Sequence, residues 1–369
     1  MGMIAQGNDI FYHLIVSTAT TTYPIYVGKR LHNRYGDFFE KYPRIAIIIN
    51  TTIYNIYKNL LDNLSLKFPQ IFHVVVGDGE EFKNITSLVN IFEKLKDNEL
   101  GRDGLIIAFG GGVVGDLAGF ASATYMRGID FIQIPTTLLA MTDSSVGGKT
   151  GINLPQRKNM VGSFHHPQVV FCDLPFLDTL PVREFNAGLM EVIKYGLILD
   201  ASFYDFIIQK KESIKKFDTN IVAYLIYRSC QLKAEIVAQD EKEKGIRTVL
   251  NFGHTIGHAL ESYSDFQFYL HGEAVALGSL VIVKFLVDKG ILTNQFLNGF
   301  IDLLTFFQLP TSIPIEFEIN QILKCLLYDK KKRHGRNEWV LLKQVGEPIW
   351  GQLIDIKEIE KILRGLQHG

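Results

Sequence analysis

The chain has 369 residues, of which 47% are hydrophobic and 21% are charged, and this composition excludes a disordered protein. Its 38 basic and 39 acidic side chains leave a formal net charge of −1, which gives no support for binding to nucleic acid or to a membrane surface. No stretch reaches the roughly 18 apolar residues of a membrane span, and residues 1–12 lack the pattern of a secretory signal, so we expect a cytoplasmic protein of two domains.

Short apolar runs in the first half of the chain predict β-strands, and helical periodicity fills several of the gaps between them. The strand runs are 24–27, 45–49, 72–76, 105–109, 131–134 and 169–172, and one clear helical pattern is 86–95. Apolar strands that alternate with helices are typical of a parallel sheet covered on both faces. We therefore predict an NAD-binding α/β domain with a parallel, Rossmann-like sheet over residues 1–179.

Amphipathic helical spacing dominates after about residue 180, with Pro175 and Pro181 marking the change. The predicted helices are 185–198, 221–238, 254–263, 272–287, 294–307 and 319–327. Residues 180–369 are therefore predicted to form an all-α domain that binds metal and substrate. The cysteines Cys172, Cys230 and Cys325 are far apart and form no CxxC pair, so neither a disulfide framework nor a thiolate metal site is expected.

A glycine-rich turn directly follows the predicted strand 105–109. Gly110, Gly112 and Gly115 satisfy the G-x-G-x-x-G pattern, which lets backbone N–H groups approach a pyrophosphate at a helix N-terminus. The pattern follows a middle strand, and no acidic residue ends a strand about 20 residues downstream, so the ribose partners must lie elsewhere. Asn50 and Glu80, each after another strand, are candidates, although either residue type is also common in turns.

The segment 145–150 contains Gly-Lys-Thr but is not a P-loop. A P-loop needs another glycine five residues before Gly148, and that position is Asp143.

Histidines and one glutamate predict a metal site. His254 and His258 are four residues apart and share one helical face, His271 follows thirteen residues later, and Glu191 lies on another predicted helix. Two imidazoles and one carboxylate form an open zinc site. The spacing leaves open which of the three histidines is the spectator, and it also leaves open that the histidines only pack or cap.

Basic residues occur within the same motifs, which in a neutral protein indicates an anionic substrate, although each of them alone is typical of a solvated surface. They are Arg127, Lys149, Lys158, Lys194, Lys233, Arg247, Lys330 and Lys331.

Taken in order, these motifs resemble the 3-dehydroquinate synthase family over about residues 23–342. The resemblance is carried by 110–116, Met-Arg-Gly at 126–128, Pro-Thr-Thr-Leu-Leu at 135–139, 143–153, Lys-Asn at 158–159, Glu-Val-Ile-Lys at 191–194, Asn-Phe-Gly-His at 251–254, His-Gly-Glu-Ala at 271–274 and Asp-Lys-Lys at 329–331.

The resemblance implies a role for each matching residue. Zinc, or cobalt in its place, would be held by Glu191, His254 and His271, with His258 a nearby polar partner in the substrate site. NAD⁺ would contact Asn50, Asp78, Glu80, Lys83, Gly112, Val113, Gly115, Asp116, Thr136, Thr137, Lys149, Lys158, Phe176 and Thr179. The substrate would contact Asp143, Lys149, Asn159, Lys194, Lys233, Arg247, Asn251 and one of Lys330 and Lys331. Arg127 would reach the active site as a phosphate ligand, in its own subunit or in the neighbouring subunit of a homodimer.

The family converts 3-deoxy-D-arabino-heptulosonate 7-phosphate into 3-dehydroquinate and phosphate, the second step of the shikimate pathway to chorismate and the aromatic amino acids. The resemblance implies a lyase that oxidises C5 transiently with NAD⁺, eliminates phosphate, reduces C5 again, opens the ring and closes the product by an intramolecular aldol addition.

Three alternatives remain open. Another sugar-phosphate cyclase, such as 2-deoxy-scyllo-inosose or 2-epi-5-epi-valiolone synthase, would share the scaffold but differ in its substrate. A metal-dependent polyol dehydrogenase would release NADH, and its uncharged substrate would not need Lys149, Lys158 and Arg247. A nucleotide-binding scaffold protein would show gaps in the metal or phosphate set, and this sequence shows none.

Overall fold

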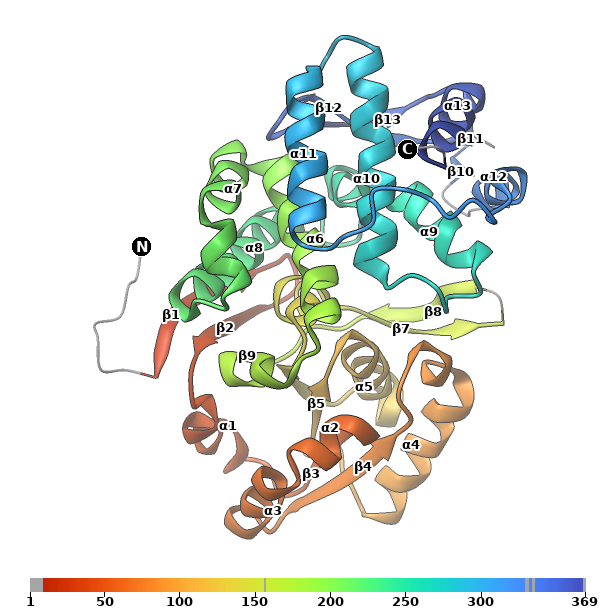
Figure 1. The fold of residues 1–369 in the computed structure, drawn as a ribbon. Coiled ribbons are helices and arrows are strands. Elements are labelled where there is room, and N and C mark those ends of the chain that lie inside the picture. Colours follow the sequence, from red (N-terminus) through yellow and green to blue (C-terminus); the bar gives the residue numbers. More distant parts are fainter. Residues whose placement is uncertain (1–8, 156, 329–331, 334–335, 368–369) are drawn as a thin grey trace. The chain divides into compact units, whose positions relative to one another are not determined.

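The computed structural model describes residues 9–155, 157–328, 332–333 and 336–367. The chain forms two compact units, Met1–Leu180 with Val222–Lys242 and Pro181–Ile221 with Glu243–Gly369 (Figure 1). The assignment of residues 1–179 to an NAD-binding domain and of residues 180–369 to a metal- and substrate-binding domain stays a prediction. The observed units differ from it at Leu180 and in residues 222–242, which belong to the first unit.

The first unit contains a seven-stranded sheet in which every pair of neighbouring strands is parallel except β1 and β2. The strands lie in the order β1 (Ile10–Ser17), β2 (Thr22–Gly28), β9 (Val170–Asp173), β6 (Asp130–Pro135), β5 (Leu105–Gly110), β3 (Ile45–Asn50) and β4 (Ile71–Val76). All six predicted strands are present, so the parallel Rossmann-like sheet is confirmed. The sequence analysis missed β1, whose side chains are mostly part-exposed.

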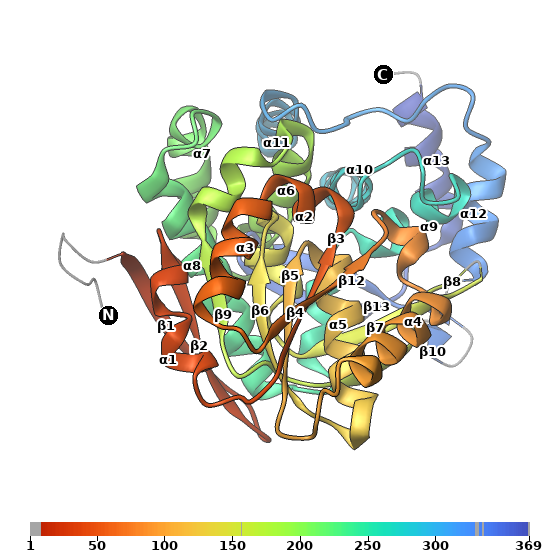
Figure 2. The ribbon, with the colours of Figure 1, turned by 90° about the horizontal axis from the view of Figure 1, so that it is seen from below.

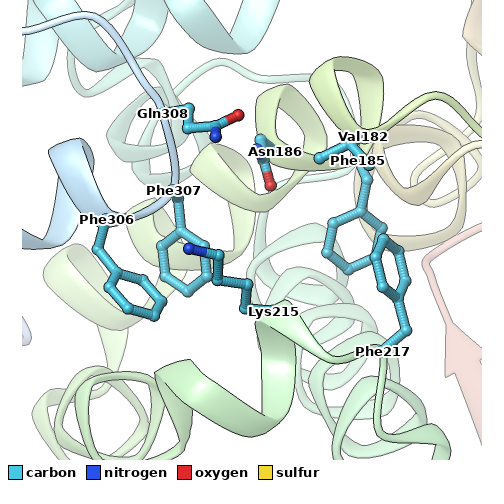
Figure 3. Close-up of a pocket in the computed structure, with 8 residues that line it drawn as sticks. All are labelled: Val182, Phe185, Asn186, Lys215, Phe217, Phe306, Phe307 and Gln308. Atoms are coloured by element: carbon cyan, nitrogen blue, oxygen red, sulfur yellow. The ribbon is translucent and has the colours of Figure 1, made fainter.

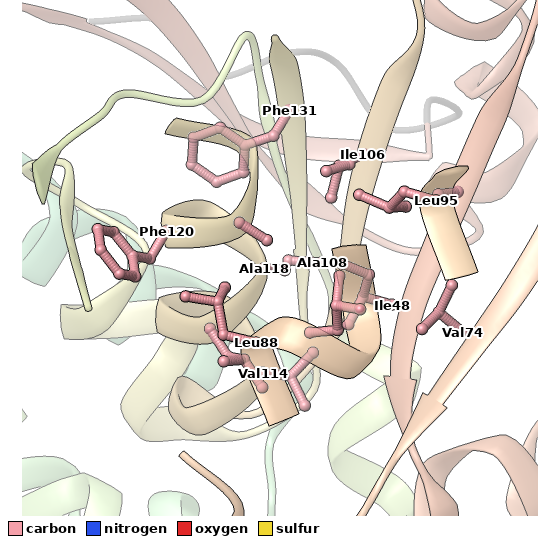
Figure 4. Close-up of a cluster of buried hydrophobic side chains, with 14 of the residues drawn as sticks. Ile48, Val74, Leu88, Leu95, Ile106, Ala108, Val114, Ala118, Phe120 and Phe131 are labelled. Atoms are coloured by element: carbon pink, nitrogen blue, oxygen red, sulfur yellow. The ribbon is translucent and has the colours of Figure 1, made fainter. Parts of the chain in front are cut away.

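Helices cover both faces of this sheet (Figures 1 and 2). The helices α2 (Thr51–Ile56) and α3 (Lys58–Lys67) follow β3, whereas α4 (Ile85–Asp97) and α5 (Gly112–Thr124) follow β4 and β5. Right-handed crossovers place α4 and α5 on the opposite face from α2 and α3. Leu88 of α4 and Val114 of α5 pack with Ile48, Val74 and Ile106 of the strands in one buried cluster (Figure 4).

The first unit also contains elements that lie outside the sheet and its covering helices. They include the π-helical turn η4 (Ala140–Ser144), the antiparallel hairpin of β7 (Lys149–Leu154) and β8 (Arg157–Phe164), the short helix η5 (Leu174–Thr179) and most of helix α8 (Thr219–Gln239). Cys172 and Cys230 are buried here, and burial raises the pKa of the Cys230 thiol to about 12. Cys325 is also free, so the three thiols are unpaired as predicted.

The second unit is helix-rich, as predicted. Its helices are α6 (Val182–Leu199), α7 (Ala201–Lys215), η6 (Ile246–Asn251), α9 (His254–Tyr263), α10 (His271–Asp288), α11 (Asn294–Phe306), α12 (Ile319–Tyr328) and α13 (Ile356–Gln367). Helix α10 is buried along most of its length, because α6, α9, α11 and α13 surround it. The unit is not purely helical, since β12 (Trp339–Gln344) and β13 (Glu347–Gln352) form a hairpin. Among the described residues, no helix is long and apolar enough to cross a membrane.

Candidate functional site

The glycine turn lies where the strand order of the sheet reverses. From β3 the chain moves outward to β4 and then returns to β5 on the other side of β3, so β3 and β5 flank a topological switch point. Ligands of such sheets bind at the carboxyl ends of the strands at this point. Asn50 ends β3 and Gly110 ends β5, and a Cβ atom on Gly110 would lie 3.2 Å from Asn50 Oδ1.

Several buried polar atoms around this turn have no hydrogen-bond partner among the residues that the structure describes. They are Asn50 Oδ1, Thr136 Oγ1 and Ser144 Oγ. Leaving such atoms unpaired costs about 1–3 kcal/mol each, which a bound polar molecule removes. A Cβ atom on Gly112 would lie 3.1 Å from Ser144 Oγ, so a side chain at Gly112 would press on Ser144. These groups and the N–H groups that begin α5 fit the hydroxyls and phosphates of a dinucleotide.

Lys83 contacts one residue that was predicted to bind the cofactor and one that was predicted to bind the substrate. Its Nζ is 2.5 Å from Asp116 Oδ2 and 2.6 Å from Asn159 Oδ1. Burial acts to lower the pKa of Lys83, but the carboxylates of Asp116 and Glu80 outweigh it and raise that pKa. The lysine is therefore held as a cation beside the helix that follows the glycine turn.

Asn153, to which the sequence analysis assigned no role, connects the same group. Its Nδ2 donates to Glu80 Oε1 at 2.8 Å, and its Oδ1 accepts the Asn159 N–H at 2.8 Å. Asn159 has a left-handed backbone, with φ of 53°, and this strain is of a kind found at binding sites. The hairpin β7–β8 thus brings Asn159 to Lys83 and Asn153 to Glu80.

Asp78 has a structural contact that explains its position. Its Oδ1 accepts hydrogen bonds from Asn50 Nδ2 and, at 3.0 Å, from the Thr52 N–H. Burial acts to raise the pKa of Asp78, but these hydrogen bonds outweigh it and lower that pKa. The carboxylate therefore orients the Asn50 amide at the switch point.

The remaining predicted cofactor residues lie in four places of the first unit. Val113 and Gly115 are in α5, and Thr136 and Thr137 follow β6. Phe176 is buried in η5 against Phe109, with ring centroids 5.1 Å apart, and Thr179 Oγ1 is 2.6 Å from Tyr57 Oη. Lys149 is exposed on β7 and Lys158 is half-buried on β8. Lys149 begins a strand and not a helix, which agrees with the rejection of a P-loop.

Asp143 and Lys233, both predicted to bind substrate, are in contact. Lys233 Nζ of α8 donates to Asp143 Oδ1 at 2.7 Å and to the Asp143 carbonyl at 2.8 Å. Asp143 lies in the π-helical turn η4, a distortion that is frequent at functional sites. The next residue, Ser144, reaches the glycine turn, so this pair stands beside the candidate dinucleotide site.

The predicted metal ligands meet in the second unit. Glu191 of α6, His254 of α9 and His271 of α10 place one donor atom each within 4.8 Å of one another. Glu191 Oε1 is 3.6 Å from His254 Nε2 and 3.8 Å from His271 Nε2. Glu191 is fully buried; the Lys194 ammonium forms an ion pair with its Oε2, whereas Oε1, which faces the two imidazoles, has no hydrogen-bond partner among the described residues. A buried carboxylate that faces two imidazole nitrogens fits a divalent cation.

His258 forms a second group with Glu261 and His271, whose ligand atoms also lie within 4.8 Å of one another. The sequence left open which histidine is the spectator, and both groups include His271. His258 stacks on His271 with ring centroids 6.1 Å apart. Glu261 was missed by the sequence analysis, although it lies one turn after His258 on the same helix.

The described residues of the second unit that were predicted to bind the anionic substrate lie on α6 and η6. Lys194 is buried and donates to the Leu250 carbonyl at 2.7 Å, which joins α6 to η6. Arg247, 1% exposed, belongs to η6. Asn251 ends η6, and its Nδ2 donates to Glu243 Oε1 at 3.0 Å. Glu243 was also missed, and no local sequence pattern marks it.

Arg127 is exposed at the end of the short helix η3 (Tyr125–Arg127) in a strained turn. Met126 and Arg127 have φ values of 49° and 70°, and Gly128 follows with 116°. Non-glycine residues adopt this region at a cost, so the turn holds Arg127 in a defined orientation. Lys330 and Lys331 lie outside the described residues.

Two hollows in the second unit contain none of the predicted site residues. One, with a volume of about 40 Å³, lies between Phe185, Phe217 and Phe307 beside Lys215 (Figure 3). The other is an open hollow formed mainly by Tyr263, Phe268 and Phe317. Both are mainly apolar, and neither offers the donors that a sugar phosphate requires.

Comparison with known protein families gives two adjacent matches. Residues 73–187 match the model for the 3-dehydroquinate synthase N-terminal domain, and residues 188–332 match the model for the 3-dehydroquinate synthase C-terminal domain. Curated relatives include 3-dehydroquinate synthase of Shewanella sp. (strain MR-4), 41% identical over 90% of this chain and 93% of the relative. Another is 3-dehydroquinate synthase of Pseudoalteromonas translucida (strain TAC 125), 44% identical over 90% of this chain and 94% of the relative.

Solved structures with the same fold include two cyclases. The structure of 2-epi-5-epi-valiolone synthase from Streptomyces hygroscopicus subsp. jinggangensis 5008, with NAD⁺ and Zn²⁺ bound, is 25% identical with a TM-score of 0.88 and covers 95% of this chain and 98% of that chain. A 2-deoxy-scyllo-inosose synthase complexed with carbaglucose-6-phosphate, NAD⁺ and Co²⁺ is 24% identical with a TM-score of 0.85, over 96% of this chain and 99% of that chain.

Proposed function

The chain belongs to the 3-dehydroquinate synthase family, and from this we propose which of its residues bind the cation, the dinucleotide and the substrate. Its reaction converts 3-deoxy-D-arabino-heptulosonate 7-phosphate into 3-dehydroquinate and phosphate, with NAD⁺ and Zn²⁺ as cofactors. The observation that carries the site assignment is the cluster in which the buried Glu191 carboxylate meets His254 and the part-exposed His271.

The cation is held by Glu191, His254 and His271. The buried Glu191 carboxylate supports this choice, because the Lys194 ammonium contacts only its Oε2 and leaves Oε1 directed at both imidazoles. The N–H groups that begin α5, together with Asn50 and Glu80 at the switch point, would hold NAD⁺. When bound, the cation lowers the pKa of a substrate hydroxyl, and NAD⁺ takes up a hydride and later returns it.

The charged residues then serve the two anionic groups of the substrate. Lys194 and Arg247 neutralise negative charge, and Arg247 can form paired hydrogen bonds to a phosphate or carboxylate. Phosphate leaves as an anion, so cations that stabilise it lower the barrier for its departure. Lys233 is oriented by Asp143. Ring opening and the aldol addition then need little beyond a fixed geometry.

The rival functions differ in substrate or in net chemistry. Identity of 41–44% to curated 3-dehydroquinate synthases, against 25% to the valiolone synthase, supports the heptulosonate phosphate as substrate. A polyol dehydrogenase would accumulate NADH, whereas this reaction regenerates NAD⁺.

One assay tests this proposal. We expect the full-length protein to release phosphate from 3-deoxy-D-arabino-heptulosonate 7-phosphate without net NADH formation. Removal of either NAD⁺ or the metal should lower the rate by at least about 100-fold, and Zn²⁺ or Co²⁺ should restore it. Glucose 6-phosphate and sedoheptulose 7-phosphate, the substrates expected for the two rival cyclases, serve as matched controls. Faster turnover of either control, or stoichiometric NADH, would contradict the proposal.

We further propose a cytoplasmic homodimer in which Arg127 completes the neighbouring active site. The free, buried thiols Cys172 and Cys230 support a reducing compartment. Arg127 is exposed on a strained turn, which supports a contact between this side chain and the neighbouring subunit. Apolar side chains exposed on β8, such as Met160 (38% exposed), support an interface with a second copy.

Subunit mixing tests the shared site. Arg127→Ala and His271→Ala should each be nearly inactive. After random reassortment of equal amounts, half of the dimers are mixed and each carries one intact site, so about a quarter of wild-type activity should return. If Arg127 served its own subunit, the mixture would show no more than the average of the two variants.

A further inference from the structure

Glu261 is a second buried carboxylate beside the candidate metal ligands. It lies on α9 with 1% exposure, and its Oε2 is 3.4 Å from His271 Nδ1. Removing a carboxylate from water costs several kcal/mol unless charges or hydrogen bonds compensate. Its burial against this imidazole therefore points to a function of the contact.

His271 lies between two carboxylates and presents a different nitrogen to each. Its Nδ1 faces Glu261 at 3.4 Å, and its Nε2 faces Glu191 at 3.8 Å. A neutral imidazole carries one N–H, and the nitrogen without hydrogen offers its lone pair to a metal. A proton on Nδ1, donated to Glu261, leaves Nε2 as the ligand atom on the side of Glu191.

His254 is arranged in the same way. Its Nδ1 is 3.0 Å from the Phe252 carbonyl, and its Nε2 is 3.6 Å from Glu191 Oε1. A carbonyl only accepts hydrogen bonds, so this contact requires a hydrogen on Nδ1. Both histidines thus use Nδ1 to contact a protein acceptor and turn Nε2 toward Glu191.

We propose that Glu261 is a positioning residue, which holds His271 in the Nδ1–H form and aims Nε2 at the cation without binding the cation itself. The inference rests on the proposed cation site at Glu191, His254 and His271. The competing arrangement, with His258, Glu261 and His271 as ligands, would take His271 Nδ1 for the metal. It would also leave Glu191 Oε1, which faces both imidazoles, without a ligand, because the Lys194 ammonium contacts only Oε2.

Three variants of the full-length, metal-free protein test the proposal by titration with Co²⁺ and by competition between Zn²⁺ and a chelator. Glu261→Ala should weaken Co²⁺ binding by about 10- to 100-fold, as loss of such an outer partner does. Glu261→Asp is the matched control for charge, because it keeps the carboxylate but shortens the side chain by one methylene. The carboxylate then lies too far from His271 Nδ1, so the Co²⁺ affinity should fall as it does in Glu261→Ala. Glu261→Gln keeps an acceptor without the charge and should lose less. Circular dichroism establishes that each variant is folded.

A second measurement reads the imidazole directly in the absence of metal. In ¹⁵N-histidine NMR spectra at a pH where His271 is neutral, the wild type should show the Nδ1–H form, and Glu261→Ala should shift the population toward Nε2–H. A merely structural role would lower stability without moving this equilibrium. An unchanged tautomer together with unchanged Co²⁺ affinity in Glu261→Ala would overturn the inference.

The outcomes separate this inference from the proposed site. If Glu191→Gln keeps full Co²⁺ affinity while Glu261→Ala abolishes it, Glu261 is a ligand, and both the inference and the cation site proposed above are wrong. If Glu191→Gln loses the metal and the Glu261 variants do not, only the positioning role is wrong.

Discussion

Replacing Glu191 with glutamine is expected to remove the bound cation and to lower kcat/KM by at least about 1,000-fold, since a metal supplies several kcal/mol of transition-state stabilisation. Glutamine has nearly the same shape but no charge, so the cluster loses its only proposed anionic ligand. Metal content after gel filtration, Co²⁺ affinity and phosphate release give the readouts. His271→Ala should act in the same direction. Unchanged metal content and rate would refute the assignment.

Glu191→Gln also leaves the buried Lys194 ammonium without its carboxylate partner. The resulting loss of stability must be distinguished from the loss of metal. Lys194 is 1% exposed and would lose its carboxylate partner, which costs about 3–5 kcal/mol of unfolding free energy in comparable buried pairs. The double variant Glu191→Gln/Lys194→Met removes both charges. It should recover stability in urea unfolding without recovering Co²⁺ binding.

Asp173→Asn is the matched control for loss of a buried carboxylate. Asp173 is 2% exposed, and its Oδ2 accepts the Leu31 N–H at 2.9 Å in the first unit. Burial raises the pKa of Asp173 to about 6, so its removal should not destabilise the protein at neutral pH. We expect unchanged metal affinity in this variant. A loss equal to that of Glu191→Gln would indicate a general effect of buried charge and not ligation.

Sequence periodicity predicted the strands that are apolar throughout, because a strand covered on both faces leaves no polar position. Strand β3 is such a case, with Ile45 to Ile49 all buried. Strand β8 was not predicted, because the seven residues after Arg157 mix glycine, polar and apolar side chains without a regular alternation. Most of these side chains are exposed. Helix α13 was missed although Ile359, Ile362, Leu363 and Leu366 have helical spacing and are buried, so its signal was available.

The candidate site was predictable where its residues are close in sequence. The spacing of His254 and His258 identified the helix face, but the choice of ligands needed the position of α6, which brings Glu191 to His254 and His271. Glu261 was visible one turn beyond His258. Its meaning depends on His271, which lies on a different helix, and no helical period relates the two. The choice of metal ligands and the role of Glu261 therefore follow from contacts between different helices, which spacing along the sequence does not reveal.

Arg247→Ala is expected to weaken binding of the phosphate substrate by about 100-fold or more, because loss of a charge-assisted contact to a desolvated anion costs about 2–5 kcal/mol. Arg247 belongs to η6, whose Leu250 carbonyl accepts a hydrogen bond from Lys194, beside the proposed cation ligand Glu191. The proposed NAD⁺ residues belong to the first unit, so NAD⁺ affinity should change by less than about threefold, the usual context effect of a residue that does not touch the ligand.

Two further variants show whether geometry or charge is lost. Arg247→Lys keeps the charge but cannot form paired hydrogen bonds, so it should recover only part of the affinity. Arg364→Ala removes an exposed guanidinium that pairs with Glu360 one turn away, and it should leave both ligands unaffected. Isothermal titration with the heptulosonate phosphate and with NAD⁺ measures the two affinities separately. Equal losses of both in Arg247→Ala would place Arg247 outside the substrate site, because a contact with the sugar phosphate alone cannot weaken the dinucleotide to the same extent.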